Sequence, residues 1–123
     1  NLEPTPLGTT LREAYEAAEH AARTRGLRRP GALLVVHTDG TLAGIFTDGD
    51  LRRHVFHGGS LEAPIGEVMT ASPTVLRADG PVREAVQLVR EKRIDEVPVV
   101  DRGGRPVGLI DVQDLVALKV IEG

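Results

Sequence analysis

The sequence predicts an α+β fold made of two pseudo-symmetric repeats, each a small sheet flanked by helices, which pack around a cleft between them. The main observation is internal similarity, because residues 33–51 match residues 97–115 at an offset of 64. A second is the order of local patterns, which in both halves reads helix, strand, turn, strand, helix. The identical pairs are Val35/Val99, Val36/Val100, Gly40/Gly104, Gly44/Gly108, Asp50/Asp114 and Leu51/Leu115.

The first helix of each repeat is predicted from apolar residues at helical spacing, which form one face that packs on a core. Thr10 is a capping residue before the first of these helices, and Gly80-Pro81 stands before the second. The apolar positions are Leu11, Ala14, Tyr15 and Ala18 in the first half and Val82, Ala85, Val86 and Val89 in the second.

Each repeat continues as two short strands around a turn that contains Asp or Gly, which predicts two hairpins. The predicted strands are residues 33–37, 42–46, 97–100 and 106–110. The predicted closing helices are residues 48–57 and 112–121. Gly58-Gly59 ends the first of these helices.

The repeats differ in length between their first helix and first strand. Residues 11–15 match residues 82–86 at an offset of 71, so the first repeat carries seven extra residues, around 25–31. We predict that residues 1–59 form the first repeat and residues 60–73 a linker with a helical turn at 65–69. The second repeat is then 74–123 and starts with a strand at 74–76. One repeat alone exposes a sheet face, so the two are expected to pack together and enclose the cleft.

The composition excludes several classes of function. The formal net charge of −3 provides no global basic field for nucleic acid. The chain has no cysteine, which excludes disulfides and thiolate metal sites and fits a reducing, cytoplasmic location. No apolar run approaches the length that crosses a bilayer, so we expect no membrane association.

The strongest local motif is at the predicted junction between strand and helix, Gly44-Ile-Phe-Thr-Asp-Gly-Asp-Leu-Arg-Arg53. Free backbone N–H groups at a helix start, the Thr47 hydroxyl and the nearby Arg52 and Arg53 are suited to a phosphate. Asp50 is suited to accept hydrogen bonds from ribose hydroxyls. The alternative is a capping box, in which Thr47 and Asp50 serve only to start the helix. Both interpretations stay open, since a capping hydroxyl can also face a ligand.

These motifs resemble the CBS domain family, whose repeats end in a Gly-hydrophobic-x-Thr/Ser-x-x-Asp/Asn signature. Tandem pairs in that family typically bind nucleotides between the repeats. The run from Gly44 to Arg53, together with Glu67-Val-Met-Thr70 and residues 98–101 and 108–115, resembles the CBS pair of KpsF/GutQ-type arabinose 5-phosphate isomerases. This resemblance implies an N-terminal sugar-isomerase domain in the parent protein, a homodimer formed through the CBS pairs, and no catalysis by this fragment itself.

The resemblance also implies a ligand and the residues that contact it. The ligand would be a nucleotide or nucleotide sugar such as AMP, ATP or CMP-Kdo, with no required cofactor and no metal. Asp111 replaces the threonine in the second repeat, so we expect one well-formed site and a degenerate second one. The ligand-binding residues implied are Thr47, Asp48, Asp50, Arg52, Arg53, Met69, Thr70, Pro98, Asp111 and Asp114. Met69 and Thr70 have the alternative of serving as core and helix cap.

Other functions and other candidate residues remain as alternatives. The chain is alternatively a structural dimerisation module with a vestigial nucleotide site. An independent enzyme is disfavoured because no nucleophile–base pair or metal cluster can be assembled. His54 and His57 lie three apart on a predicted helix, where surface positions are favoured over a metal site. The basic patch of Arg23, Arg25, Arg28 and Arg29 is interpreted as a solvated loop, with contact to a partner domain as the alternative.

Overall fold

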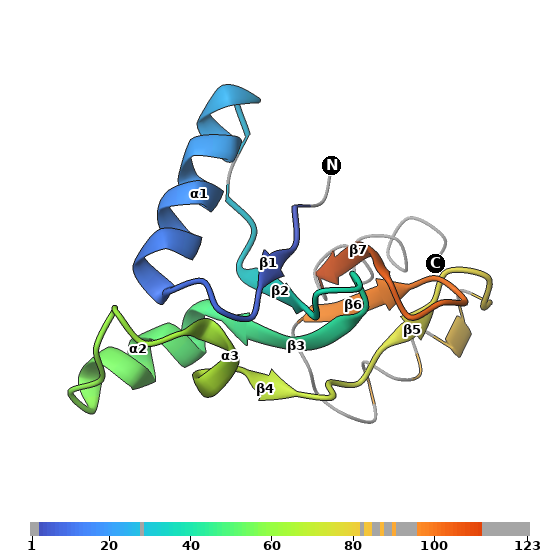
Figure 1. Cartoon of the computed structure of the whole chain (residues 1–123). Coiled ribbons are helices and arrows are strands. Elements are labelled where there is room, and N and C mark those ends of the chain that lie inside the picture. Colours follow the sequence, from blue (N-terminus) through green and yellow to red (C-terminus); the bar gives the residue numbers. More distant parts are fainter. Residues whose placement is uncertain are drawn as a thin grey trace. The chain divides into compact units, whose positions relative to one another are not determined.

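A computed structural model of the chain describes residues 3–27, 29–81, 83, 84, 87, 90 and 96–111. Residue 111 is described by its backbone alone. The chain divides between Pro73 and Thr74 into two compact units. Within the described residues each unit contains one small sheet, of four strands in the first and three in the second (Figure 1). The mixed α+β class predicted from the repeat pattern is confirmed.

The first unit is organised around helix α1, Leu11–Thr24, which starts where the sequence predicts. Thr10 Oγ1 accepts a hydrogen bond from the Glu13 amide at 3.1 Å, and the Thr10 amide donates to Glu13 Oε1 at 3.1 Å. This reciprocal pair satisfies two amides that the helix start would otherwise leave without partners. The interpretation of Thr10 as the cap is therefore confirmed.

The sheet of the first unit has the strand order β1-β2-β3-β4. Strands β2, Ala32–Val36, and β3, Leu42–Thr47, are antiparallel and joined by a turn in which Gly40 has a φ of 88°. This turn requires a left-handed conformation that glycine adopts without strain. Strand β1, Thr5–Pro6, adds in parallel to β2, and strand β4, Thr70–Ala71, adds antiparallel to β3. The hairpin was predicted, but the two outer strands were not.

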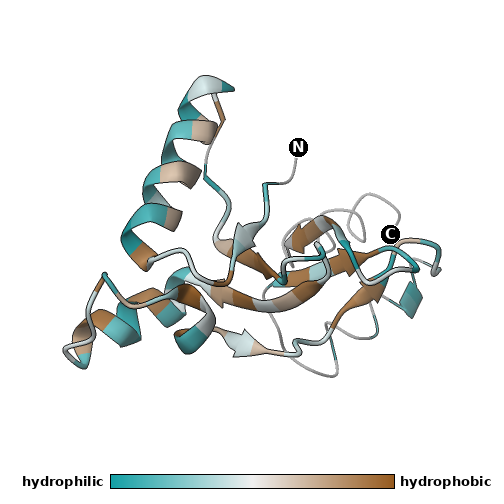
Figure 2. Cartoon of the chain, viewed as in Figure 1, coloured by the Kyte–Doolittle hydropathy of each residue, from teal (hydrophilic) through white to brown (hydrophobic). Residues whose placement is uncertain are grey.

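The core of the first unit lies where the inner face of the sheet meets the stripe of α1. The buried cluster consists of Leu11, Ala14, Leu33, Val35, Phe46 and Ile65. Tyr15 and Ala18 are partly buried against it, which confirms the predicted helical stripe. Figure 2 shows the same pattern, with hydrophobic colour along β2 and β3 and mixed colour on α1.

Two further helices complete the first unit. Helix α2, Asp48–Phe56, continues from the end of β3, and the short helix α3, Ile65–Val68, follows it (Figure 1). Ile65 is fully buried in the core, so the predicted linker segment packs into this unit. None of the helices in the described part of the chain combines the length and apolar character that crossing a bilayer requires.

The second unit repeats the backbone of the first. Strand β5, Leu76–Arg77, pairs in parallel with β6, Glu96–Val100, and β7, Pro106–Asp111, pairs antiparallel with β6. A register shift falls between Val99 and Val100, at the counterpart of the shift between Val35 and Val36. The internal repeat is therefore a repeat of strand pairing as well as of sequence.

Some predicted boundaries of the second half change. The strand expected at residues 74–76 is instead β5, because only Leu76 and Arg77 pair with β6. The apolar positions Val82, Ala85, Val86 and Val89 and the predicted helix 112–121 lie outside the described residues. The predicted boundaries of repeats and linker, and the cleft between the repeats, stay predictions.

Gly44 permits the fourth strand to lie against β3. A β-carbon at residue 44 would fall 2.5 Å from the Thr70 carbonyl oxygen and 2.5 Å from Met69 Sδ. The sulfur belongs to a flexible side chain, but the carbonyl belongs to β4 and moves only with the strand. A side chain at residue 44 is therefore incompatible with the observed pairing of β4.

We expect Gly44→Ala to lower the free energy of unfolding by about 1–3 kcal/mol, because overpacking displaces β4. Chemical denaturation followed by circular dichroism measures the change. Gly8→Ala is the control, since no described atom lies within 4 Å of its β-carbon position and its φ is not left-handed. Equal stability of the two variants would contradict the assigned role of Gly44.

Candidate functional site

The chain passes from β3 into α2 through a reciprocal pair of hydrogen bonds. Thr47 Oγ1 accepts from the Asp50 amide at 3.1 Å, and the Thr47 amide donates to Asp50 Oδ2 at 2.9 Å. The capping interpretation of Thr47 and Asp50 is thus confirmed. The other carboxylate oxygen, Asp50 Oδ1, accepts a hydrogen bond from Arg53 Nη2 at 2.5 Å. Asp50 is therefore held from both sides, and its carboxylate is fixed beside the first turn of α2.

Three polar atoms converge on the open side of Gly49, the second residue of α2. The position that a β-carbon would take there is 3.5 Å from Arg53 Nη1, 3.6 Å from Thr47 Oγ1 and 3.7 Å from Arg52 Nη2. Glycine leaves this space unfilled, and the positive end of the helix dipole faces it. Two guanidinium groups, a hydroxyl and a helix N-terminus at one point are the donor set of an anion site.

Asp48, the first residue of α2, forms an ion pair with Arg29 from the seven-residue insertion. Arg29 Nη1 donates to Asp48 Oδ1 at 2.8 Å and Arg29 Nη2 to Asp48 Oδ2 at 3.4 Å. The Asp48 amide donates to the Gly31 carbonyl at 2.9 Å. These hydrogen bonds raise the pKa of Arg29 above its ordinary value, chiefly through the bond to Asp48. Asp48 therefore serves as a partner of Arg29, although the sequence placed it among the ligand-binding residues without foreseeing this pair.

For Arg29, one of the four arginines of the basic patch, the structure corrects the interpretation as part of a solvated loop. The Arg29 side chain is only 22% exposed, and its guanidinium lies 5.0 Å from the centre of the Tyr15 ring. Its Nε also donates to Glu19 Oε1 at 3.1 Å. No sequence signal identified this contact, because Asp48 lies 19 residues further along the chain and the two residues meet only in the folded unit.

Tyr15 has an unusual environment for its hydroxyl group. The oxygen is buried and has no partner in hydrogen-bonding geometry within the described part of the chain. Burial raises the pKa of Tyr15, and the negative charge of nearby Asp48 raises it further, while Arg29 opposes the shift. The neutral phenol is thus strongly favoured in the folded state.

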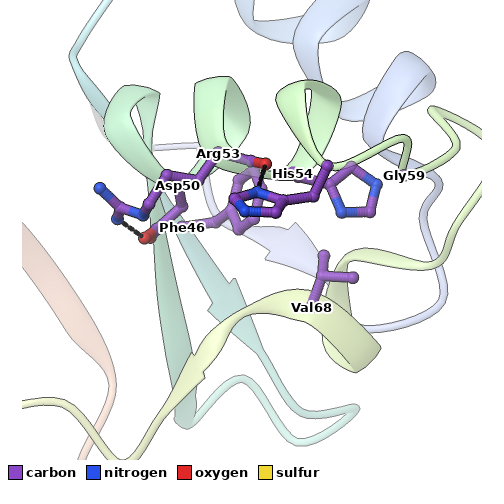
Figure 3. Close-up of a pocket in the computed structure, with 7 residues that line it drawn as sticks. Phe46, Asp50, Arg53, His54, Gly59 and Val68 are labelled. Atoms are coloured by element: carbon purple, nitrogen blue, oxygen red, sulfur yellow. Dashed lines mark hydrogen bonds and ion pairs between the residues drawn. The ribbon is translucent and has the colours of Figure 1, made fainter.

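A pocket of about 480 Å³ opens beside one face of α2. Figure 3 shows Arg53 directed to Asp50 at one end and Val68 of α3 facing the helix. Its lining residues are Phe46, Asp50, Arg53, His54, His57, Gly59 and Val68. Apolar and charged groups therefore share this pocket, and two residues of the predicted ligand site form part of its wall.

Both histidines of the pocket interact with backbone carbonyl groups. The His54 Nε2 lies 2.8 Å from the Ser60 oxygen, and the His57 Nδ1 lies 2.7 Å from the Arg53 oxygen. When each ring is neutral, these bonds place its hydrogen on the nitrogen facing the carbonyl. Within the described residues no three His, Cys, Asp or Glu side chains gather as a metal site requires.

The remaining predicted site residues belong to other elements. Met69 packs on the core of the first unit and is the C-cap residue of α3, while Thr70 is exposed in β4. Pro98 is fully buried in β6. Asp111 is described only through its backbone at the end of β7, and Asp114 lies outside the described residues. The structure therefore brings together Thr47, Asp50, Arg52 and Arg53, all of them around Gly49.

Comparison with known proteins gives the family. The sequence model of the CBS domain matches residues 5–57 and 65–120. The chain belongs to the CBS domain family. Its two matches are consecutive, so it is a CBS pair, as the internal repeat indicates.

Relatives of the CBS pair include two bacterial sugar-phosphate isomerases. The chain is 37% identical over 97 residues to the arabinose 5-phosphate isomerase GutQ of Escherichia coli, covering 77% of this chain and 30% of that protein. It is 38% identical over 92 residues to the isomerase KdsD of Pseudomonas aeruginosa, covering 74% of this chain and 28% of that protein. The chain thus spans less than a third of the length of these relatives.

A solved structure has the same fold. The CBS domain protein PAE2072 from Pyrobaculum aerophilum, complexed with AMP, superposes with a TM-score of 0.74 at 21% identity. The match covers 100% of this chain and 95% of that one.

The raised pKa of Tyr15 predicts a loss of stability at alkaline pH. A tyrosine in the unfolded chain ionises near pH 10, whereas folded Tyr15 keeps its proton to higher pH. Its contribution to stability is therefore complete below about pH 10 and is lost as the pH rises toward the folded value. We expect the free energy of unfolding to fall more steeply above about pH 10 in the wild type than in Tyr15→Phe, by at most about 1.4 kcal/mol per pH unit.

Urea denaturation at several pH values between about 8 and 11 tests this expectation, since the other titrating groups are common to both proteins. Parallel curves for the two proteins would show that the Tyr15 hydroxyl is not protected as the structure indicates.

Proposed function

We propose that this CBS pair is the ligand-sensing part of a longer sugar-phosphate isomerase, and that a nucleotide or nucleotide sugar binds with a phosphate beside Gly49. The observation that carries the proposal is the convergence of Arg52, Arg53 and the Thr47 hydroxyl on the open side of that glycine. The isomerase relatives support the identity of the parent protein. The AMP complex of a protein with this fold supports the class of ligand.

The phosphate position follows from the donors available there. A phosphate beside Gly49 would receive hydrogen bonds from Arg52 and from the Gly49 amide, which lies in the first turn of α2, where amides have no acceptor within the helix. Phosphate contacts of this kind are strong because both partners are charged. The net charge of −3 does not prevent a phosphate from binding, because salt screens the charges that lie far from the site and the nearby arginines dominate the local field.

Asp50 would bind the ribose by exchanging one partner. Its Oδ2 stays in the capping box, while Oδ1, now paired with Arg53, would accept a ribose hydroxyl. Arg53 would then turn from Asp50 to the phosphate, so its charge remains compensated throughout. This exchange lets one residue pair serve helix capping and ligand binding in turn.

The second repeat would bind weakly or not at all. Asp111 occupies the position of Thr47, and a carboxylate repels a phosphate unless a cation or proton intervenes. Asp114 occupies the position of Asp50 and would then serve only a degenerate site.

In the parent enzyme, ligand binding would regulate the isomerase domain. A ligand shifts an equilibrium between two conformations only if it binds one of them more tightly than the other. If the two conformations of the CBS pair act differently on the isomerase domain, this shift would change the activity of that domain. AMP, ATP and the nucleotide sugar CMP-Kdo are the candidate effectors. The proposal assigns catalysis to the N-terminal domain and sensing to this pair.

A thermal-shift panel of AMP, ATP, CMP, CTP and CMP-Kdo tests the proposal and identifies the ligand. A ligand at 100 times its Kd stabilises the fold by about 2.7 kcal/mol. Gly49→Ala is the decisive variant, because its β-carbon would lie 3.5 Å, 3.6 Å and 3.7 Å from the three donors and hinder their contact with a phosphate, while alanine favours the helix. We expect this variant to be at least as stable as the wild type without ligand and to lose the ligand-induced shift.

Asp50→Asn provides the matched variant for the ribose contact. It keeps an oxygen for the Thr47 amide but loses the charge paired with Arg53. We expect a weaker shift with every nucleotide that binds the wild type. A full shift in both Gly49→Ala and Asp50→Asn would place the ligand elsewhere, and no shift of the wild type with any nucleotide would reject the sensing role.

A second candidate function, a dimerisation module, is favoured by the apolar end of α2. Phe56 is 87% exposed and Val55 is 51% exposed. Large apolar side chains at one place on a surface commonly mark a protein–protein contact. In this alternative the CBS pair would hold two parent subunits together through α2.

Sedimentation equilibrium of the wild type and of Phe56→Asp tests the dimer. We expect the wild type to be dimeric at micromolar concentration and the variant to be monomeric, because a carboxylate in an apolar contact is costly to desolvate. Leu27→Asp is the control, since Leu27 is 65% exposed and follows the C-terminal end of α1 instead of lying on α2. A monomeric wild type would remove this alternative.

A further inference from the structure

Four side chains from three segments of the first unit form a cluster behind the start of α2. Tyr15 and Glu19 come from α1, Arg29 from the insertion and Asp48 from the first turn of α2. Arg29 contacts the other three through its Nε, through both terminal nitrogens and through the face of its guanidinium. The cluster therefore joins the insertion to both α1 and α2.

The cluster is specific to the first repeat. At the offset of 71, Tyr15 corresponds to Val86 and Glu19 to Arg90; at the offset of 64, Arg29 corresponds to Arg93 and Asp48 to Val112. The second repeat thus keeps an arginine but has neither the aromatic ring nor either carboxylate. The second repeat also lacks the threonine of the capping box. The cluster and the Thr47 capping box are therefore both features of the first repeat.

Asp48 poses an electrostatic problem for the anion position beside Gly49. It precedes Gly49 directly, and a carboxylate so close to a phosphate would repel it. Arg29 holds both oxygens of that carboxylate and supplies the compensating charge. The pair also fixes the first residue of α2, together with the bond from the Asp48 amide to Gly31.

We propose that Arg29 is a positioning residue of the ligand site, which makes the first turn of α2 competent to bind phosphate by holding and neutralising Asp48. This inference rests on the proposed function of the Gly49 site. It assigns a role to the Arg29 contacts, because Tyr15, Glu19 and Asp48 correspond to residues of different chemistry in the second repeat. The first repeat therefore combines the proposed site with all four members of the cluster.

Isothermal titration of AMP and of adenosine against Arg29→Gln provides the test. We expect AMP binding to weaken about tenfold or more, because an uncompensated carboxylate then faces the phosphate. Adenosine has no phosphate, so its affinity is expected to change less than about threefold. Arg12→Gln is the matched control, since it removes the same charge from an exposed pair with Glu62.

The double variant Arg29→Gln/Asp48→Asn separates positioning through charge from a general loss of structure. Because it removes the uncompensated carboxylate as well, we expect it to recover a large part of the AMP affinity lost in Arg29→Gln. Equal AMP affinity of Arg29→Gln and Arg12→Gln, or a double variant that binds no better than Arg29→Gln, would overturn the proposal.

Amide hydrogen exchange keeps this test independent of the ligand. We expect the Asp48 and Asp50 amides, which donate to the Gly31 carbonyl and to Thr47 Oγ1, to exchange faster in Arg29→Gln than in the wild type, whereas Arg12→Gln leaves them unchanged. If the wild type binds none of the nucleotides, the proposed function fails, and exchange then decides the positioning role alone. Unchanged exchange at Asp48 and Asp50 in Arg29→Gln would overturn that role.

Discussion

The two hydrogen bonds between Thr47 and Asp50 determine how the first unit presents its chemistry. They end β3 and begin α2 within one turn, which exposes the helix N-terminus next to the sheet. Because Asp50 is fixed in this way, its second oxygen holds Arg53 close to Gly49. The same bonds that start the helix therefore arrange the donors of the proposed anion site, so one local structure would serve both folding and binding.

The carboxylates in the first turn of α2 are each paired with an arginine. Asp48 is compensated by Arg29 and Asp50 by Arg53, while Arg52 has no ion pair among the described residues. A chain with a net charge of −3 can thus offer a local positive site. The buried Tyr15 hydroxyl lies beside this network without a hydrogen-bond partner in the described part of the chain. A buried hydroxyl without a hydrogen-bond partner lowers the stability of the fold. The Tyr15 ring offsets part of this loss through its contacts with Arg29 and Phe46.

The two repeats keep the same backbone while their side chains diverge. Strand pairing and the register shift recur in both units, because main-chain hydrogen bonds depend little on side-chain identity. An anion site depends on particular side chains, and these differ where Asp111 stands in place of Thr47. A duplicated fold can therefore preserve its architecture and specialise one half for a ligand.

The sequence by itself determined the features that depend on near neighbours. The hairpins, the Thr10 cap and the capping box of Thr47 and Asp50 are relations between residues a few positions apart, and the repeat follows from comparing the sequence with itself. The structure confirms these features for the described residues. The short strands β1 and β4 were not predicted, because a segment of two residues shows no periodicity of its own. Such a strand forms only beside an existing strand of the sheet. The contact of Arg29 with Asp48, and the core position of Ile65, were likewise decided by tertiary structure alone. Such contacts join distant segments, and their geometry exists only after the helices have packed on the sheet.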